Sequence, residues 1–139
     1  MDGFPVVIDI EPRFRDTDAM GHVNNAVYIT YFEVVRTAYW LRLTGVKRYD
    51  EVPFILVHVS ADFRSPAVVG ETLGVGMRVT RLGGKSFDAA YRIVSREDER
   101  LIAEGSSVMV MFDYQKQATF PVPDDLRARV RALEGRADL

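Results

Sequence analysis

The sequence predicts an α+β fold in which one antiparallel sheet curves around a long central helix. Residues 26–43 contain no Gly or Pro and are apolar around almost the whole helical circumference. From Phe54 onward, apolar residues recur with a period of two, which is typical of strands. Because 139 residues suffice for one domain and are too few for two ordinary ones, we expect residues 1–139 to form a single domain.

The central helix is expected to follow a first strand and a polar loop. Residues 6–14 are short and β-branched, residues 15–21 end in Gly, and Asn24 and Asn25 are suited to cap the helix. Gly45 is a stop signal. A narrow polar edge is left on the helix, formed by Thr30, Glu33, Arg36 and Thr37. Glu33 is within reach of Arg36 or Thr37 one turn on, and we interpret it as an ion-pair partner rather than a catalytic group.

Four further strands, making about five in all, are predicted over residues 54–63, 73–80, 87–93 and 101–113, running as a meander. The pair Gly83-Gly84 marks a tight turn between the second and third of these segments. Residues 124–133 predict a short surface helix after two prolines. A single sheet covers so apolar a helix only by wrapping it.

Composition excludes several classes of function. The 18 Lys and Arg are scattered among 20 Asp and Glu, which is unlike a nucleic-acid-binding surface. With no Cys, disulfides, thiolate metal sites and a Cys nucleophile are excluded. The N-terminal residues are acidic rather than basic-then-apolar, and no apolar run has membrane-spanning length, so we expect a cytoplasmic protein without membrane contact.

The segment DTDAMGHVNN, residues 16–25, concentrates polar residues immediately before the helix. One interpretation is a capping loop. A calcium loop is rejected because Val27 stands where a bidentate Glu is required. A transition-metal site is not expected, since His22 and His58 are the only histidines and neither has a partner at ligand spacing.

The other interpretation is catalytic. Free backbone N–H groups and the positive end of the helix dipole favour developing negative charge, so a thioester carbonyl bound there would be polarised. Asp18, a few residues upstream, is placed to act on the carbonyl carbon as a nucleophile or by deprotonating water. These arguments leave the capping loop and the catalytic loop equally open.

The stretch DTDAMGHVNNAVYITYFEVVRTAYW closely resembles the signature of the 4-hydroxybenzoyl-CoA and acyl-CoA thioesterase family of hotdog proteins. The segments ADFRSPAVVGETLGV, LGGKSF and VPDDLRARV resemble later parts of that family. The resemblance implies a hotdog fold, hydrolysis of acyl-CoA to free acid and CoA, and no cofactor. The alternatives are a hydratase or dehydratase on the same fold and a non-catalytic acyl-CoA-binding protein.

By this resemblance Asp18 is the catalytic carboxylate and the backbone N–H near Asn25 polarises the thioester, with Gly21 and Val23 beside the substrate. His22 is an orienting residue or a packing residue, because related acyl-carrier-protein thioesterases have Asn where this chain has Met20.

Coenzyme A carries phosphates, so cations and N–H groups near strand ends are candidates to bind it. These candidates are Arg64 and Ser65 in the segment Arg64-Ser65-Pro66, and Lys85 and Ser86 in the segment Gly84-Lys85-Ser86. The exposed edges of a single sheet favour a homodimer or homotetramer, and the resemblance implies a site at the subunit interface.

Overall fold

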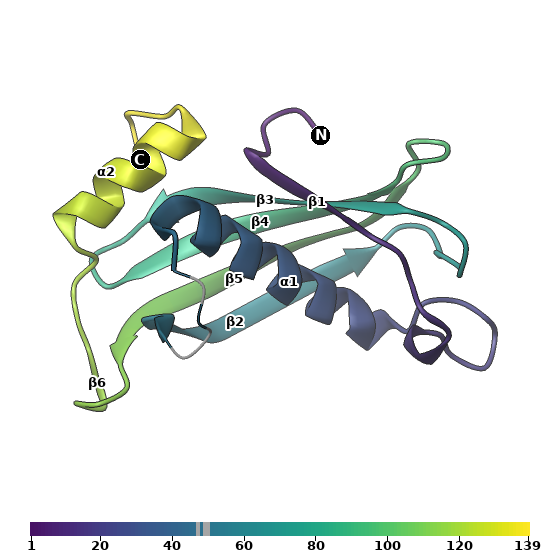
Figure 1. Cartoon of the computed structure of the whole chain (residues 1–139), viewed down its shortest axis with the longest axis horizontal. Coiled ribbons are helices and arrows are strands. Elements are labelled where there is room, and N and C mark those ends of the chain that lie inside the picture. Colours follow the sequence, from purple (N-terminus) through teal and green to yellow (C-terminus); the bar gives the residue numbers. More distant parts are fainter. Residues whose placement is uncertain (47, 49–50) are drawn as a thin grey trace.

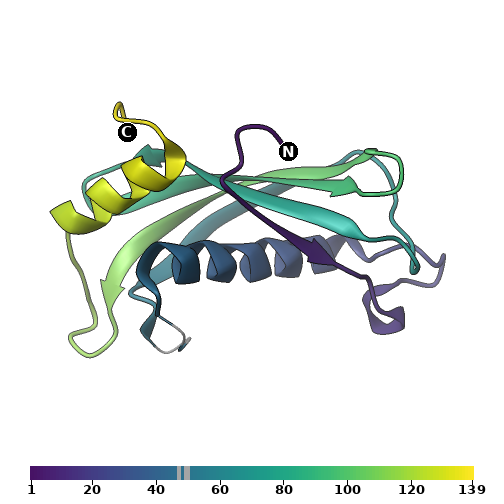
Figure 2. The same ribbon diagram turned by 45° about the horizontal axis from the view of Figure 1, so that its top comes forward.

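In the computed structural model, which describes residues 1–46, 48 and 51–139, a curved sheet wraps around helix α1. Helix α1 lies along the concave side of the sheet, and the shorter α2 lies over one end (Figures 1 and 2). The predicted α+β class is confirmed. In chain order the elements are β1 (Val6–Ile10), η1 (Phe14–Asp16), α1 (Asn25–Thr44), β2 (Phe54–Phe63), β3 (Leu73–Leu82), β4 (Ser86–Ser95), β5 (Leu101–Asp113), β6 (Ala118–Thr119) and α2 (Asp124–Glu134).

The five long strands lie in the order β1-β3-β4-β5-β2, with every neighbouring pair antiparallel. Strands β3, β4 and β5 form a meander as predicted. The prediction that residues 54–63 open this meander is wrong, because β2 pairs with β5 at the far edge, from Phe54 opposite Met111 to Phe63 opposite Ala103. The connection over residues 64–72 is long enough to carry the chain from this edge across to β3.

The first strand is shorter than predicted. It ends at Ile10, and Phe14 belongs to the 3-10 turn η1. Pro12 has no N–H to offer a sheet, so it ends the strand register. The two-residue strand β6, which pairs with the end of β5, has too short a pattern to be predicted from sequence.

Helix α1 begins and ends at its predicted signals. The Asn24 side-chain oxygen accepts a hydrogen bond from the Ala26 N–H at 2.9 Å, so Asn24 is the cap and Asn25 is the first helical residue. At the other end, Gly45 has a left-handed φ of 75°, and its N–H donates to the Leu41 carbonyl at 2.7 Å.

The buried side of α1 differs from the prediction at Arg36. Phe32 and Val35 face the sheet, and Arg36, one turn after Phe32, is carried to the same side and is only 8% exposed. The predicted ion pair between Glu33 and Arg36 is not formed within the described part of the chain. Instead, the Thr37 hydroxyl donates to the Glu33 backbone carbonyl at 3.0 Å.

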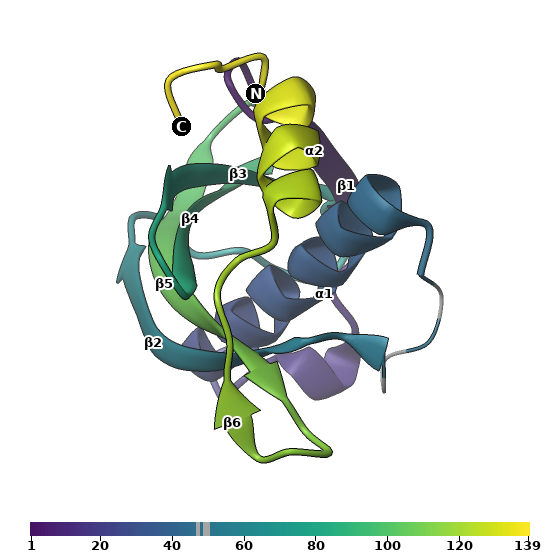
Figure 3. The same ribbon diagram turned by 90° about the vertical axis from the view of Figure 1, so that its left-hand side faces the viewer.

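Close packing of α1 on the middle of the sheet is possible because β5 has a glycine there. The Phe32 ring stacks on Tyr91 of β4 with centroids 4.6 Å apart. A Cβ added at Gly105 would lie 2.4 Å from the Phe32 ring, so only glycine fits beneath it. Viewed end-on, the sheet curls around the helix (Figure 3).

Candidate active site

Asp16 fixes the loop that leads into α1. Its carboxylate oxygens accept hydrogen bonds from the Arg13 N–H at 2.9 Å, the Arg13 guanidinium at 3.0 Å and the Tyr31 hydroxyl at 3.0 Å. Burial on its own would raise the pKa of Asp16, but the hydrogen bonds from Arg13 and Tyr31 outweigh it, and the pKa lies below its usual value. Asp16 is therefore an ionised anchor whose oxygens are already occupied.

Asp18, two residues further on, is half-buried and held differently. One of its oxygens, Oδ1, accepts from the backbone N–H groups of Met20 at 2.9 Å and His22 at 3.2 Å. From the residues that the structure describes, no hydrogen bond reaches the other oxygen, Oδ2. The loop thus grips this carboxylate by one oxygen and leaves the second available to a ligand.

The first turn of α1 also leaves one donor unused. The N–H groups around it are all bonded, at 2.8 to 2.9 Å, in the pairs Val23 to Ala67 O, Asn24 to Asp16 O, Ala26 to Asn24 Oδ1 and Val27 to Asn24 O. For the Asn25 N–H, the described residues supply no acceptor. An unpaired N–H at the positive end of a helix is suited to bind a carbonyl oxygen or an oxyanion.

Asp18 and Asn25 both line one pocket of about 270 Å³. The pocket lies between the start of α1, the loop before it and the end of β2, which are close together in both overall views (Figures 1 and 2). It is lined by Asp18, Met20, His22, Val23, Asn25, Tyr28, Phe63, Arg64, Ser65 and Pro66. Asp18, which has a free carboxylate oxygen, and Asn25, which has a free helical N–H, therefore line the same cavity.

Two aromatic residues, His22 and Tyr28, also line this pocket. His22 is half-buried and its backbone N–H and carbonyl hold Asp18, while its ring makes no hydrogen bond to any described residue. Tyr28 is 2% exposed, and its hydroxyl has no partner of normal geometry among the described residues. Burial is the main reason that the pKa of Tyr28 is raised, with the nearby Ala67 N–H working against it.

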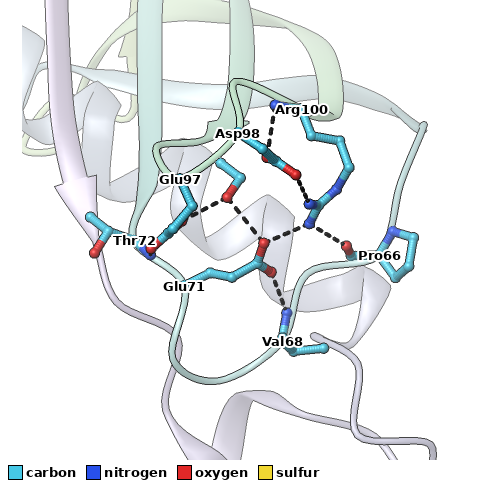
Figure 4. A network of polar contacts seen from close by, with 8 residues as sticks. Pro66, Val68, Glu71, Thr72, Glu97, Asp98 and Arg100 are labelled. Atoms are coloured by element: carbon cyan, nitrogen blue, oxygen red, sulfur yellow. Dashed lines mark hydrogen bonds and ion pairs between the residues drawn. The ribbon is translucent and has the colours of Figure 1, made fainter.

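Part of the pocket lining, Arg64, Ser65 and Pro66, belongs to the connection between β2 and β3, which we call the pocket wall. Its Ala67 carbonyl accepts the Val23 N–H at 2.8 Å, and Val68 pairs with His22. A polar network behind it fixes this connection (Figure 4). Glu71 accepts from the Val68 N–H at 2.8 Å, the Ser95 hydroxyl at 3.0 Å and Arg100 at 2.6 Å.

Arg100 is the centre of this network. It also donates to the Pro66 carbonyl at 3.1 Å and to Asp98 at 2.6 Å. The hydrogen bond to Glu71 is the main cause that raises the pKa of Arg100. Because Arg100 holds Pro66 and Glu71 holds Val68, the network sets the position of the pocket wall without touching the cavity.

The predicted substrate-binding residues separate into two groups. Val23, Arg64 and Ser65 line the pocket, and Gly21, with a left-handed φ of 78°, closes the turn beside Asp18. Arg64 also lies 3.6 Å from Glu104 and 3.8 Å from Asp62, so its charge is partly balanced.

Lys85 and Ser86 lie elsewhere in the same chain. They belong to the hairpin between β3 and β4, and Lys85 donates to Thr119 at 3.3 Å. Within one chain they do not border the pocket.

Sequence reasoning missed some of the residues that shape the site. Phe63, which precedes the candidate segment Arg64-Ser65-Pro66, lines the pocket, and so does Tyr28, which was assigned only to the helix. The sequence signal for Phe63 was its adjacency to this candidate binding segment. No local pattern connects Glu71 and Arg100, which are 29 residues apart and meet only in the fold.

Metal and membrane features can be stated for the described residues. Within residues 1–46, 48 and 51–139 no group of three or more His, Asp or Glu side chains is arranged to hold a metal ion. Neither helix there combines the length and apolar character that crossing a bilayer requires.

Comparison with known proteins places the chain in a family. Residues 12–130 match the model of the thioesterase-like superfamily. The chain belongs to this superfamily. A thioesterase from Thermus thermophilus, solved in complex with coenzyme A and Zn, is similar with a TM-score of 0.89 and 34% identity over 98% of both chains.

Two curated relatives are also similar over most of their lengths. The long-chain acyl-CoA thioesterase FadM of Escherichia coli K12 is 24% identical over 89% of this chain and 96% of its own. The acyl-CoA thioester hydrolase YbgC of Escherichia coli O6:H1 is 26% identical over 85% of this chain and 90% of its own. The predicted hotdog family and the prediction of a thioesterase are thereby confirmed.

Proposed function

We propose that this superfamily member hydrolyses an acyl-CoA thioester to a free acid and CoA, with Asp18 and the Asn25 N–H as the reacting groups. The observation that carries the proposal is that Asp18, whose Oδ2 is unpaired, and Asn25, whose N–H is unpaired, both line one pocket in the described part of the chain. Membership of the thioesterase-like superfamily, and similarity to acyl-CoA thioesterases and to a CoA-bound thioesterase, support it.

In the proposed reaction the thioester carbonyl oxygen accepts the Asn25 N–H. The carbonyl carbon becomes more electrophilic, and the oxyanion that forms is stabilised by the same N–H and by the helix dipole. Asp18 Oδ2 either removes a proton from water as it attacks or attacks the carbon itself, forming an anhydride that water then hydrolyses. Either route breaks the C–S bond, gives the sulfur a proton and yields the free acid.

The remaining groups around the pocket receive supporting roles in this proposal. His22 positions the Asp18 loop through its backbone, and the half-buried Ser65 and the cation of Arg64 lie where the CoA moiety would enter. Lys85 and Ser86 can contact the same CoA only if a second chain brings them there. A homo-oligomer is therefore part of the proposal, and the cytoplasmic location stays a prediction.

A thiol-release assay across a panel of acyl-CoA esters tests the proposed function. Wild type should release free CoA thiol, and the Asp18→Asn variant should not, while Asp125→Asn on the exposed start of α2 serves as the matched control. Because an Asn side-chain oxygen can still accept from Met20 and His22, the loop should persist.

Two other results would contradict the proposal. A change in acyl unsaturation with no thiol released would indicate a hydratase or dehydratase. Equal acyl-CoA affinity of wild type and Asp18→Asn, with no turnover in either, would indicate a binding protein.

A further inference from the structure

Tyr28 carries a buried hydroxyl that the fold holds at the pocket but does not use. Its side chain is 2% exposed and lines the same pocket as Asp18 and Asn25, and its hydroxyl has no partner of normal geometry among the described residues. Leaving a buried polar group unpaired is unfavourable, whereas a phenylalanine ring would fill the same space without that cost. Stability therefore does not explain why this position carries a hydroxyl.

The ring of Tyr28 is held in place by two aromatic contacts. It packs edge-on against Tyr31, with ring centroids 6.1 Å apart, and against Phe63 of β2, with ring centroids 5.7 Å apart. Tyr31 is itself fixed, because its hydroxyl donates to the Asp16 carboxylate at 3.0 Å. A hydroxyl on a ring fixed in this way can orient a small molecule without first having to be ordered itself.

The direction of side chains on a helix brings this hydroxyl toward the start of α1. Tyr28 follows Asn25 by three residues, so both lie on nearly the same side of the helix, and a long side chain there leans toward the N-terminus. Asp18 is also near, since its negative charge and that of Glu71 add to burial in raising the pKa of Tyr28. No hydrogen bond joins the side chains of Asp18 and Tyr28. A small molecule between these two groups can therefore contact both.

The Tyr28 hydroxyl is suited to donate a hydrogen bond. Burial outweighs the effect of the nearby Ala67 N–H and raises the pKa of Tyr28, so the phenol keeps its proton at neutral pH. With an N–H group beside its oxygen, the hydroxyl proton is the part that lacks an acceptor among the described residues. A water molecule that gives a proton to Asp18 gains negative charge on its oxygen, and an O–H donor stabilises that charge.

We propose that Tyr28 is a further catalytic residue, whose hydroxyl donates to the water molecule that Asp18 deprotonates. The water oxygen bonds to the thioester carbon while its proton moves to Asp18 Oδ2. The oxyanion at the Asn25 N–H then collapses, the C–S bond breaks, and the proton on Asp18 passes to the sulfur. This inference rests on the proposed hydrolysis and selects its general-base route, because direct attack by Asp18 breaks the C–S bond before any water reacts.

Rapid-mixing measurements of thiol release by Tyr28→Phe test the inference, with the acyl-CoA ester that wild type hydrolyses fastest. The first turnover and the steady state should both be slower than in wild type by roughly 10-fold to 100-fold. Affinity for unreacted acyl-CoA, measured by calorimetry in Asp18→Asn with and without Tyr28→Phe, should be equal, because the hydroxyl holds water and not substrate. Tyr114→Phe is the matched control, since that hydroxyl donates to the Phe54 carbonyl at 2.9 Å, outside this pocket.

Three results would overturn this inference while leaving the proposed hydrolysis in place. Equal rates for Tyr28→Phe and wild type would show that the hydroxyl takes no part in the reaction. A fast first release of thiol followed by slow turnover would show that Asp18 attacks the carbon itself. Weaker acyl-CoA binding with Tyr28→Phe would make Tyr28 a substrate-binding or structural residue. If wild type releases no thiol from any ester, the proposed hydrolysis and this inference are both wrong.

Discussion

Asp16 and Asp18 are the same residue type, two positions apart in one loop, but they differ in burial and in their hydrogen-bond partners. Asp16 is 4% exposed and uses both oxygens on Arg13 and Tyr31. Asp18 borders a pocket and uses one oxygen on backbone N–H groups. The contrast shows that Asp16 has both oxygens engaged in holding the loop, whereas Asp18 keeps one oxygen available to a ligand, as its proposed role requires.

The largest expected effect is on turnover in Asp18→Asn. Removing the general base or nucleophile should lower kcat by roughly 100-fold to 10,000-fold. The free energy of unfolding should stay within about 1 kcal/mol of wild type, because the Asn side-chain oxygen can still accept from the N–H groups of Met20 and His22. Steady-state thiol release and urea unfolding measure the two quantities. If Asp18→Asn lost stability as well as activity, Asp18 would be a structural anchor like Asp16.

Asp16→Asn should show the opposite pattern. An amide cannot accept from Arg13 and Tyr31 as the carboxylate does, so the free energy of unfolding should fall by about 2–3 kcal/mol. At a temperature where the variant is folded, its kcat should lie within roughly tenfold of wild type, as for a group outside the pocket. If Asp16→Asn were as stable as wild type, Asp16 would not be a structural anchor.

The lowered pKa of Asp16 makes a prediction about acid. A carboxyl with a lowered folded pKa contributes stability that is fully present above its unfolded pKa of about 3.9 and is lost as the pH falls through the folded value. Between about pH 5 and pH 3, urea unfolding should show wild type losing more stability than Asp16→Asn. Parallel curves for the two proteins would show that Asp16 is not preferentially ionised in the folded state.

Arg100→Ala tests whether a residue outside the loop of Asp16 and Asp18 helps to position the pocket. Without Arg100, the network in Figure 4 no longer holds Pro66 and Glu71, and the wall that bonds Val23 should shift. We expect kcat/KM to fall by about tenfold through misplacement of the pocket. Arg136→Ala, which breaks a comparable exposed pair with Asp138, is the matched control. If the two substitutions had equal effects on kcat/KM, the network would have no positioning role.

Tyr28→Phe should have only a small effect on stability. The Tyr28 hydroxyl is enclosed and has no partner of normal geometry among the described residues, so its removal should leave stability unchanged or raise it by up to about 1 kcal/mol. Thermal unfolding measures this change. A decrease of more than about 1 kcal/mol would show that the hydroxyl is hydrogen-bonded in solution, as the Tyr31 hydroxyl is.

The parts of the fold that the sequence predicts are those with local causes. Helix α1 follows from residues 26–43, its Asn24 cap and Gly45, and β3, β4 and β5 follow from their period of two. The edge position of β2 does not, because its pairing with β5 joins strands that are distant in the sequence and has no local signature. The burial of Arg36 was missed because a helical pattern does not indicate which polar residue the packing of Phe32 and Tyr91 will enclose.

The candidate site shows the same division. The motif DTDAMGHVNN indicated the loop and, with the family resemblance, Asp18. It could not separate the surroundings of Asp18 from those of Asp16, since the difference lies in Arg13 and Tyr31 folding back onto one carboxylate. The wall at Pro66 and its support by Arg100 depend on contacts between distant segments, which only the structure supplies.

The central claim is that the Asn25 N–H and Asp18 act on the same thioester. Infrared spectroscopy of an acyl-CoA with an isotope-labelled carbonyl, bound to Asp18→Asn, tests it most directly, because the substrate should bind and persist. The account predicts a carbonyl stretch at lower frequency than for the same thioester in water, as expected of a carbonyl polarised at a helix start. An unshifted band from a fully bound, unreacted substrate would contradict the account.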